Sequence, residues 1–351
     1  MRAQRSGILV GLLLIGQGWC SNPPALADVA VLSSQSAPTS VSAYRDVVGW
    51  SEGQVDDQGN VQGYKLVFSI GDMPPVPARA ATRAVPFDLD LGPDAKGRAV
   101  AVYSRCRRES SDSSFRERVS RLPVYTQGEG CDVYQYDVVT GREVRVRGAS
   151  KPGRSEVLPT RWRDRIAFAV TGNGTRARRR GAAMVIRSNG REEKVAGGSG
   201  SNAGDGPDGP GPVALELYGR SLAYVWDVVG FECRGSEDPS FKFDPVRSEV
   251  WVARHGEKQR RFGLGCSTDG TVRFSSPSFA AGRLVFLRSQ QTDEVIERRA
   301  LGGGSRTLVA TPPCTRSISP LMGMVAFARL ATCPQPATGQ QPGYEIGTLT
   351  D

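Results

Sequence analysis

The sequence predicts an all-β fold, a six-bladed β-propeller built from four-stranded antiparallel blades. Three observations lead to this prediction. Glycine (42 residues) and proline (23 residues) are abundant in the 351-residue chain, which is typical of many turns and short strands. Few segments keep a 3.6-residue apolar period for more than two turns, so little helix is expected. One short motif, a turn followed by a β-branched and aromatic run, occurs six times.

The six copies of this motif set the number of blades. They lie roughly 41 to 67 residues apart, a spacing typical of a four-stranded blade with loops of variable length. Each copy is expected to be the second strand of its blade. The copies span residues 45–50, 97–103, 164–170, 219–226, 282–287 and 323–329.

Each copy has the neighbours that a blade requires. A short segment precedes it and is predicted to be the innermost strand. A segment with alternating apolar residues follows it, and most of these third strands end at a glycine-containing tight turn that leads into an outer strand. The predicted innermost strands are 41–44, 86–91, 156–162, 212–218, 275–279 and 317–321.

The two ends of the chain are expected to close the ring. The sixth blade has a third strand at 344–349 and no outer strand after it, whereas the apolar segment 29–32 has no blade of its own. Because a closed ring leaves no unpaired sheet edge, we expect residues 29–32 to complete the sixth blade. This count of strands favours a propeller over a β-sandwich.

The N-terminal residues are typical of a secretory signal. Arg2 and Arg5 precede an apolar run at 8–15, and Ala25-Leu26-Ala27 forms a small-x-small cleavage site. The sequence therefore predicts a signal peptide at 1–27 and one propeller domain at 28–351, secreted or held in the cell envelope. The apolar run is far shorter than the roughly 20 residues of a spanning helix, so no transmembrane segment is expected.

The cysteines agree with export. Removal of Cys20 with the signal leaves six, and an even number in an exported protein predicts three disulfides, for which fifteen pairings are possible. Without any CxxC spacing and with His255 as the single histidine, a zinc site is disfavoured. Pairing of nearest neighbours along the predicted blades gives Cys106–Cys131, Cys233–Cys266 and Cys314–Cys333.

Charge says little about partners. The net charge of +9 comes almost entirely from arginine, and its densest run, at 176–180, is interpreted as a solvated loop. No nucleic-acid-binding motif occurs, so a nucleic-acid partner is not expected.

Candidate chemistry is sparse. There is no G-x-S-x-G motif, and His255 lies in a predicted hairpin turn, so a serine–histidine catalytic set is not expected. Asp88 and Asp90 alternate with apolar residues on the first strand of the second blade, so their side chains share the face opposite the apolar one. Toward the channel, they could bind Ca²⁺ or serve as general acid and base. The favoured alternative is that they hydrogen-bond adjacent strands while Asp94 caps its turn.

The tryptophans leave two interpretations open. Trp50, Trp226 and Trp251 lie within predicted strands, and Trp162 lies next to one. They could pack within the blades, which is the commoner use, or offer exposed faces that stack on sugars.

Two segments carry a family resemblance. Residues 88–104, with Gly92-Pro93-Asp94 leading into a strand, and residues 317–327 resemble the repeat of TolB-type propellers, and 133–137 is similar to the third strand of that repeat. The resemblance implies a six-bladed propeller and says little about function. The chain departs from TolB in lacking a separate N-terminal α/β domain and in carrying cysteines, so the Tol–Pal role is not carried over.

Together these features favour a non-enzymatic binding or scaffolding propeller with a protein or a cell-wall glycan as partner. The alternative is a metal-dependent hydrolase or lyase that uses acidic residues at the central channel. No cofactor is predicted apart from a Ca²⁺ ion at the Asp88 and Asp90 carboxylates.

Overall fold

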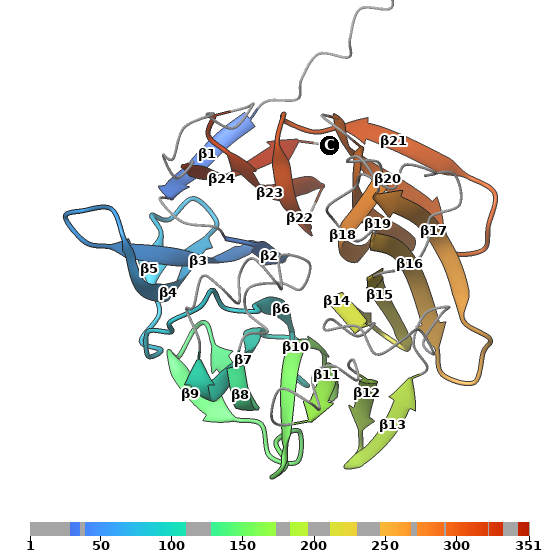
Figure 1. Ribbon diagram of the computed structural model, residues 1–351, viewed down its shortest axis with the longest axis horizontal. Helices are drawn as coiled ribbons and strands as arrows, with labels where there is room; N and C mark the ends of the chain where they lie inside the picture. Colours follow the sequence, from blue (N-terminus) through green and yellow to red (C-terminus); the bar gives the residue numbers. More distant parts are fainter. Residues whose placement is uncertain are drawn as a thin grey trace, which may run out of the picture.

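The computed structural model is a ring of six four-stranded antiparallel sheets around a common axis (Figure 1), which confirms the predicted fold class. The described part of the chain comprises residues 29–35, 39–109, 128–172, 183–195, 211–229, 246–267, 272–290, 293–321, 323–332 and 343–350. It contains strands and no helix, and so no helix that could span a membrane. The predicted signal and the arginine run lie outside it.

We number the blades I to VI along the chain and their strands from the axis outward. Blade I is β2 (Val41–Tyr44), β3 (Val47–Val55), β4 (Val61–Ile70) and β5 (Val76–Pro77). Blade II is β6 (Asp90–Pro93), β7 (Ala99–Glu109), β8 (Gly128–Asp137) and β9 (Arg142–Arg145). Blade III is β10 (Arg154–Trp162), β11 (Arg165–Gly172), β12 (Ala183–Ser188) and β13 (Arg191–Val195).

The second half repeats this order. Blade IV is β14 (Gly211–Tyr218), β15 (Ser221–Val229), β16 (Val246–Arg254) and β17 (Arg260–Ser267). Blade V is β18 (Val272–Ala280), β19 (Arg283–Gln290), β20 (Asp293–Ala300) and β21 (Arg306–Ala310). Blade VI is β22 (Thr315–Leu321), β23 (Met324–Leu330), β24 (Tyr344–Thr350) and, from the N-terminal side of the chain, β1 (Val29–Gln35).

The outer position of blade VI is filled by β1, which pairs antiparallel with β24 from Val29 opposite Leu349 to Gln35 opposite Tyr344. The strand is longer than the expected segment 29–32. A register shift between Val31 and Ser33 interrupts the ladder. Sequence-distant ends therefore lie side by side at the top of Figure 1.

One predicted inner strand is wrong in its bounds. β6 begins at Asp90 rather than at residue 86. Pro86 has no N–H to give to a ladder, and the N–H of Phe87 donates to Ser51 Oγ of blade I at 2.8 Å. The N–H of Ser104 on β7 donates to the Asp88 carboxylate at 2.7 Å, so a side chain replaces the backbone acceptor that a strand would have supplied.

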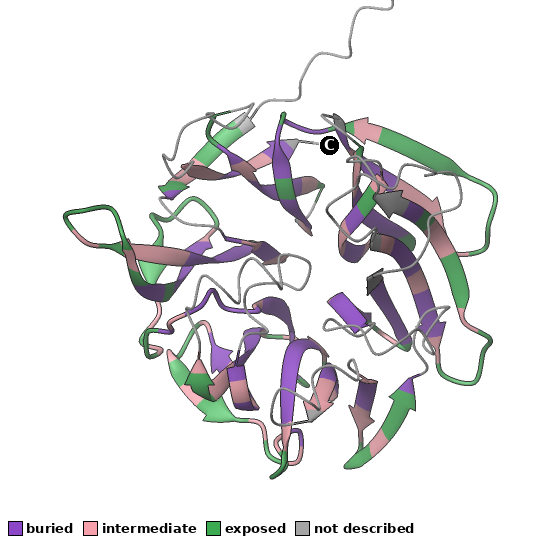
Figure 2. Ribbon diagram, in the orientation of Figure 1, coloured by how far each residue is buried: buried purple, intermediate pink, exposed green. Residues whose placement is uncertain are grey.

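Apolar clusters fill the spaces between neighbouring blades. Tyr64 and Phe68 of blade I pack with Tyr103 and Tyr136 of blade II, and five more clusters join the other neighbours around the ring. Buried residues accordingly concentrate on the middle strands, and exposed ones on the outer strands (Figure 2). Trp50 and Trp226 lie in two such clusters, so packing explains them.

Close approaches and tight turns account for particular residues. In the β12–β13 hairpin, Asn189 and Gly190 have φ values of 50° and 79°, the left-handed conformation that this predicted turn requires. A Cβ on Gly92 would lie 2.1 Å from the carbonyl oxygen of Arg161 on blade III, so no side chain fits there. Asp94 Oδ1 accepts the N–H groups of Lys96 and Arg98 at 2.9 Å each, which confirms the predicted turn cap.

A disulfide joins Cys106 of β7 to Cys131, its cross-strand partner on β8. This confirms the first of the three expected pairings. Cys314 is also disulfide-bonded. Cys233, Cys333 and the side chain of Cys266 lie outside the described residues, so the other two pairings stay predictions.

Candidate functional site

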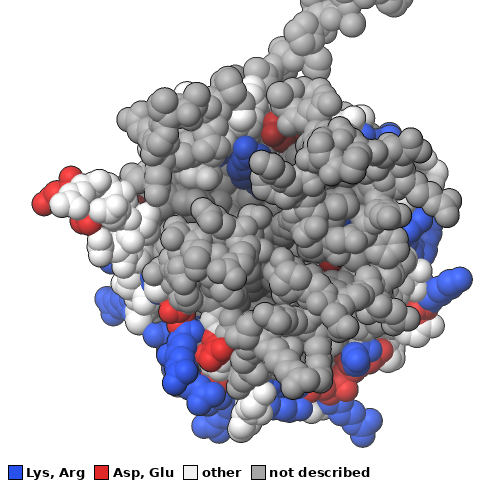
Figure 3. All heavy atoms as spheres, in the orientation of Figure 1, with Lys and Arg blue, Asp and Glu red and all other residues white. Residues whose placement is uncertain are grey.

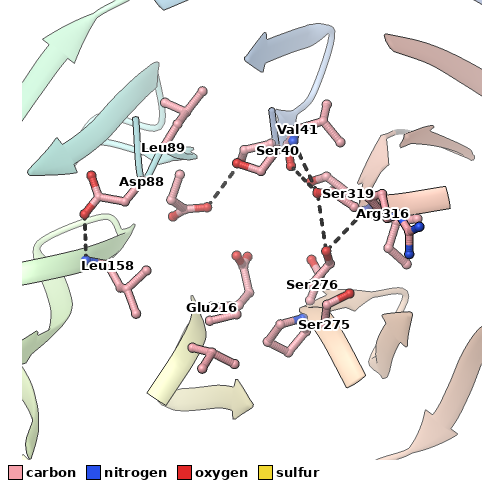
Figure 4. A pocket seen from close by; sticks show the side chains of 18 of the residues that line it. Ser40, Val41, Asp88, Leu89, Leu158, Glu216, Ser275, Ser276, Arg316 and Ser319 are labelled. Carbon is pink, nitrogen blue, oxygen red and sulfur yellow. Dashed lines mark hydrogen bonds between the residues drawn. The ribbon is translucent and has the colours of Figure 1, made fainter. Parts of the chain in front are cut away.

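A cavity of about 540 Å³ lies in the channel at the centre of the ring (Figure 4). Side chains from the inner strands of all six blades line it, and most of them are polar. Its polar lining includes Ser40, Ser42, Asp88, Asp90, Glu216, Asp227, Arg273, Ser275, Ser276, Ser278, Ser289, Arg316, Ser317 and Ser319. The volume falls within the usual range for small-molecule pockets, roughly 300 to 1,000 Å³.

Hydroxyl side chains on the inner strands join several neighbouring blades. Ser42 Oγ of blade I accepts the N–H of Leu91 of blade II at 2.8 Å. Thr160 Oγ1 of blade III accepts the N–H of Leu217 of blade IV at 2.8 Å. We call bonds of this kind inter-blade latches. Others are Ile318 N–H to Ser276 Oγ, Val41 N–H to Ser317 Oγ and Ala43 N–H to Ser319 Oγ.

Asp88 also acts as an inter-blade latch, although its acceptor is a carboxylate rather than a hydroxyl group. Every acceptor site of this carboxylate is occupied. Its carboxylate accepts hydrogen bonds from the N–H and Oγ of Ser104, at 2.7 and 2.6 Å, and from the N–H of Leu158 of blade III at 2.8 Å. The guanidinium of Arg83, itself buried, lies 3.3 Å away. Figure 4 shows the Asp88 carboxylate directed toward Leu158 rather than toward Glu216. Asp88 therefore holds blades II and III together.

Asp90 is placed differently. It accepts hydrogen bonds from Ser42 Oγ at 3.3 Å and from the N–H of Arg161 at 3.1 Å, which also tie it to blades I and III. Its carboxyl group is in addition hydrogen-bonded to the carboxyl group of Glu216, which comes from β14 of blade IV. Figure 4 shows Glu216 pointing into the cavity. Two carboxyl groups form such a bond only when one of them carries a proton.

Burial sets the protonation of this carboxyl pair. It raises the pKa of Asp90 to about 6, although hydrogen bonds from Thr160 and Arg161 oppose the rise. Burial, and then the negative charge of Asp90, raise the pKa of Glu216 well above its usual range. The buried pair therefore holds a proton to higher pH than two separate exposed carboxyl groups would. The pair presents the cavity with one acidic donor and one anionic acceptor.

The wall across the cavity from this pair is basic and rich in hydroxyl groups. Arg273 and Arg316 are exposed side chains that line it, together with Ser276 and Ser317, whose Oγ atoms lie 3.3 Å apart. Figure 4 shows Arg316 on the side opposite Asp88. A ligand in the cavity would thus meet hydrogen-bond donors on one wall and the carboxyl pair on the other.

Glu216 was not among the residues predicted from the sequence, although the alternation along its strand indicates its position. The predicted inner strand 212–218 alternates Val213, Leu215 and Leu217 with Ala214 and Glu216, as the strand of Asp88 and Asp90 does. Applied to every inner strand, the same alternation would have placed Glu216 on the channel side. Its pairing with Asp90 could not be read in this way, because blade III lies between the two blades.

Three further residues considered as candidates from the sequence, His255, Trp251 and Trp162, do not line the cavity. His255 is in the turn between β16 and β17, where its Nδ1 is 2.7 Å from Glu193 Oε2 and its side chain is half exposed. Trp251 donates its indole N–H to Glu249 at 2.8 Å. Trp162, at the end of β10, lies against Tyr218, with the two ring planes tilted by 50°.

Metal binding at the predicted carboxylates stays a prediction. Within the described ranges, no three His, Cys, Asp or Glu side chains are grouped so that they could hold a metal ion. The four donors to Asp88 leave it no free lone pair for Ca²⁺, which takes six to eight oxygen ligands.

No protein-family model and no curated protein matches the chain. Solved structures do match. TolB from Acinetobacter baumannii is 13% identical with a TM-score of 0.45, and the alignment covers 82% of this chain and 60% of that one. Prolyl endopeptidases are 10% identical with a TM-score of 0.45, covering 92% and 41%. The chain thus spans less than two thirds of these two proteins.

A third match extends over nearly all of both chains. It is the GH93 α-L-arabinofuranosidase of Fusarium graminearum, determined with arabinobiose. It is 11% identical with a TM-score of 0.50, and the alignment covers 93% of this chain and 95% of that one. At such identities these likenesses concern the fold alone. They agree with the propeller fold that the sequence predicted.

Proposed function

We propose that the protein is a binding module whose channel cavity takes a small polyhydroxylated ligand, such as a sugar unit of a cell-envelope glycan. The observation that carries this proposal is the hydrogen-bonded pair of Asp90 and Glu216 facing a wall of hydroxyl and guanidinium groups across one cavity. Each sugar hydroxyl both donates and accepts a hydrogen bond. The carboxyl pair of Glu216 and Asp90, together with Arg316, supplies the complementary groups.

Export is part of the proposal. Residues 1–27 have the composition of a signal peptide, and the Cys106–Cys131 disulfide suits an oxidising compartment. A scaffold of six blades with a rigid channel would then act in the cell envelope or outside the cell. A protein partner on the same module is compatible with this role.

The experiment is isothermal titration calorimetry and thermal unfolding of the oxidised protein with a panel of monosaccharides and cell-wall glycan fragments. A ligand at 100 times its Kd adds about 2.7 kcal/mol to the free energy of unfolding. The variant Glu216→Gln should weaken the binding of the responding sugar, because an amide cannot replace the acidic O–H. The matched control Glu257→Gln changes the same side chain at an exposed turn and should bind like the wild type. A flat response to every sugar contradicts the proposal.

The alternative function is hydrolysis or elimination with Glu216 as general acid. The raised pKa of Glu216 favours it, because a carboxyl group with a raised pKa keeps its proton to higher pH and can give it to a leaving group. Against it, the two carboxyl groups are hydrogen-bonded, whereas the pairs of glycoside hydrolases stand at least about 5 Å apart. Release of reducing or unsaturated ends from glycans on incubation with the protein, lost in Glu216→Gln, would establish the alternative and overturn a purely binding role.

A further inference from the structure

Three aromatic rings form a row across neighbouring blades where the inner strands end. Trp162 ends β10 of blade III, Tyr218 ends β14 of blade IV, and Phe279 lies one residue before the end of β18 of blade V. The ring centroids of Trp162 and Tyr218 are 4.1 Å apart, and those of Tyr218 and Phe279 are 5.7 Å apart. We call these three residues the aromatic row. It lies at the turn end of the inner strands, beyond the cavity residue Glu216.

Trp162 and Phe279 pack in part against the clusters between blades, whereas Tyr218 belongs to no such cluster among the described residues. Tyr218 is 44% exposed, and Trp162 and Phe279 each keep part of their surface open to solvent. The aromatic residues that fill the blade cores nearby, Tyr224 and Phe286, are fully buried. Aromatic rings that touch across adjacent blades, tilted by 50° and 34°, and that stay partly open to solvent are typical of a binding surface.

An exposed arginine accompanies each ring. Arg163, Arg220 and Arg283 lie in or directly after the two-residue turns that follow the three inner strands. No hydrogen bond or ion pair joins their guanidinium groups to another described residue. One carboxylate, Asp164, lies in the same group of turns.

Some basic side chains at the outer edge of the ring, by contrast, have acidic partners. There, basic and acidic side chains interleave (Figure 3), as in the ion pairs of Arg145 with Asp132 at 2.8 Å and of Lys151 with Glu192 at 2.7 Å. The three arginines beside the aromatic row have no such acidic partner among the described residues. The positive charge of these turns is therefore not neutralised by an ion pair.

The turns themselves are open and held in place. A Cβ built on Gly219 or on Gly282 would meet no atom within 4 Å, so nothing in the described structure covers them. Arg165 donates a hydrogen bond to the carbonyl oxygen of Gly219, which ties the turns of blades III and IV together. This bond holds the backbone of the turn after β14 in place, so that part of the surface loses little conformational freedom when a ligand binds.

We propose that the aromatic row, together with Arg163, Arg220 and Arg283, binds an anionic polysaccharide that contains uronic acid units. The C–H faces of pyranose rings are apolar and stack on aromatic rings, and guanidinium groups bind carboxylates through paired hydrogen bonds. A chain of uronic acids offers both features at each sugar, as the surface does at each blade. This surface is separate from the channel cavity and needs neither Asp90 nor Glu216.

The test is isothermal titration calorimetry of the oxidised full chain with oligogalacturonate and with its fully methyl-esterified form. The ester keeps the sugar rings and removes the charge. We expect the charged oligomer to bind, the ester to bind about tenfold more weakly, and added salt to weaken binding of the charged form. Tyr218→Ala should lower the affinity about tenfold, whereas Tyr218→Phe keeps the ring and should stay within about twofold.

Arg220→Ala should weaken binding, and the matched control Arg142→Ala, an exposed arginine on β9, should not. Tyr218 and Arg220 do not line the channel cavity, so a loss of affinity in their variants separates this test from the channel site. Absence of oligogalacturonate binding, equal binding of the ester, or equal losses in Arg142→Ala and Arg220→Ala would overturn the proposal. So would binding of poly-glutamate that equals that of oligogalacturonate and ignores Tyr218→Ala, because it would indicate an acidic protein partner.

Discussion

Asp88 and Asp90 lie two residues apart on one chain segment, and the neighbouring blades surround their carboxyl groups with different partners. Asp88 faces four donors, including the buried Arg83, and no other carboxyl group is bonded to it among the described residues. Asp90 accepts hydrogen bonds from Ser42 and Arg161, at 3.3 and 3.1 Å, and from Thr160, and it is also paired with the carboxyl group of Glu216. The comparison shows that two neighbouring carboxyl groups acquire different chemistry when a buried guanidinium group lies beside one of them and a second carboxyl group beside the other.

The largest loss of stability is expected from removing the Asp88 carboxylate, whose acceptor sites are all occupied. Asp88→Ala leaves the guanidinium of Arg83, whose side chain is 1% exposed, with Glu109 as its remaining ionic partner, and leaves two buried N–H groups without an acceptor. The free energy of unfolding should fall by about 3 kcal/mol or more. Urea denaturation measures it, with the exposed Asp46→Asn as control. A loss no larger than that of the control would mean that Asp88 is not a structural latch.

A smaller loss is expected from the latch beside Asp90. Thr160→Val keeps the shape of the side chain and removes the acceptor for the buried N–H of Leu217. The free energy of unfolding should fall by about 1 to 2 kcal/mol. The same substitution at the exposed Thr307 should cost less, because β-branched residues suit an edge strand. Equal losses at the two positions would show that the hydrogen bond between Thr160 and Leu217 does not measurably stabilise the ring.

The carboxyl pair predicts a pH dependence of stability that Glu216→Gln should remove in part. Both pKa values are raised in the folded state, so between about pH 4 and about pH 6 the native protein binds more protons than the unfolded chain. Stability contributed by the pair is therefore present at acid pH and lost as pH rises through the folded pKa values. Glu216→Gln keeps a donor to Asp90 and loses one titrating group.

The variant should match the wild type near pH 4 and exceed it by about 1 to 2 kcal/mol near pH 8. Denaturant titrations at both pH values measure the difference, and Glu257→Gln should follow the wild type throughout. Parallel curves for Glu216→Gln and the wild type would show that the two carboxyl groups do not share a proton.

The smallest effect is expected from Ca²⁺. With the acceptors of Asp88 filled and Asp90 hydrogen-bonded to Glu216, the melting temperature should not change measurably on addition of Ca²⁺ or EDTA. A rise with Ca²⁺ that EDTA reverses and Asp90→Asn abolishes would contradict this. It would also shift the preference to the metal-dependent alternative.

The features that depend on local sequence pattern could be predicted from the chain alone. The six turn-and-strand repeats predicted six blades, and the Asp94 turn cap and the Cys106–Cys131 bridge follow from residues close in the chain. Inner strands with regular alternation were placed well. β6 was not, because the Asp88 side chain takes the place of the backbone acceptor at that point.

Only the tertiary structure decided which side chains meet across the channel. The pairing of Asp90 with Glu216 joins blades II and IV, and the aromatic row of Trp162, Tyr218 and Phe279 joins blades III, IV and V. Neither can be read from the alternation within one strand, because each depends on how neighbouring blades are shifted along the ring axis relative to one another. That shift is set by packing between blades and by the inter-blade latches, whose partners lie far apart in the chain.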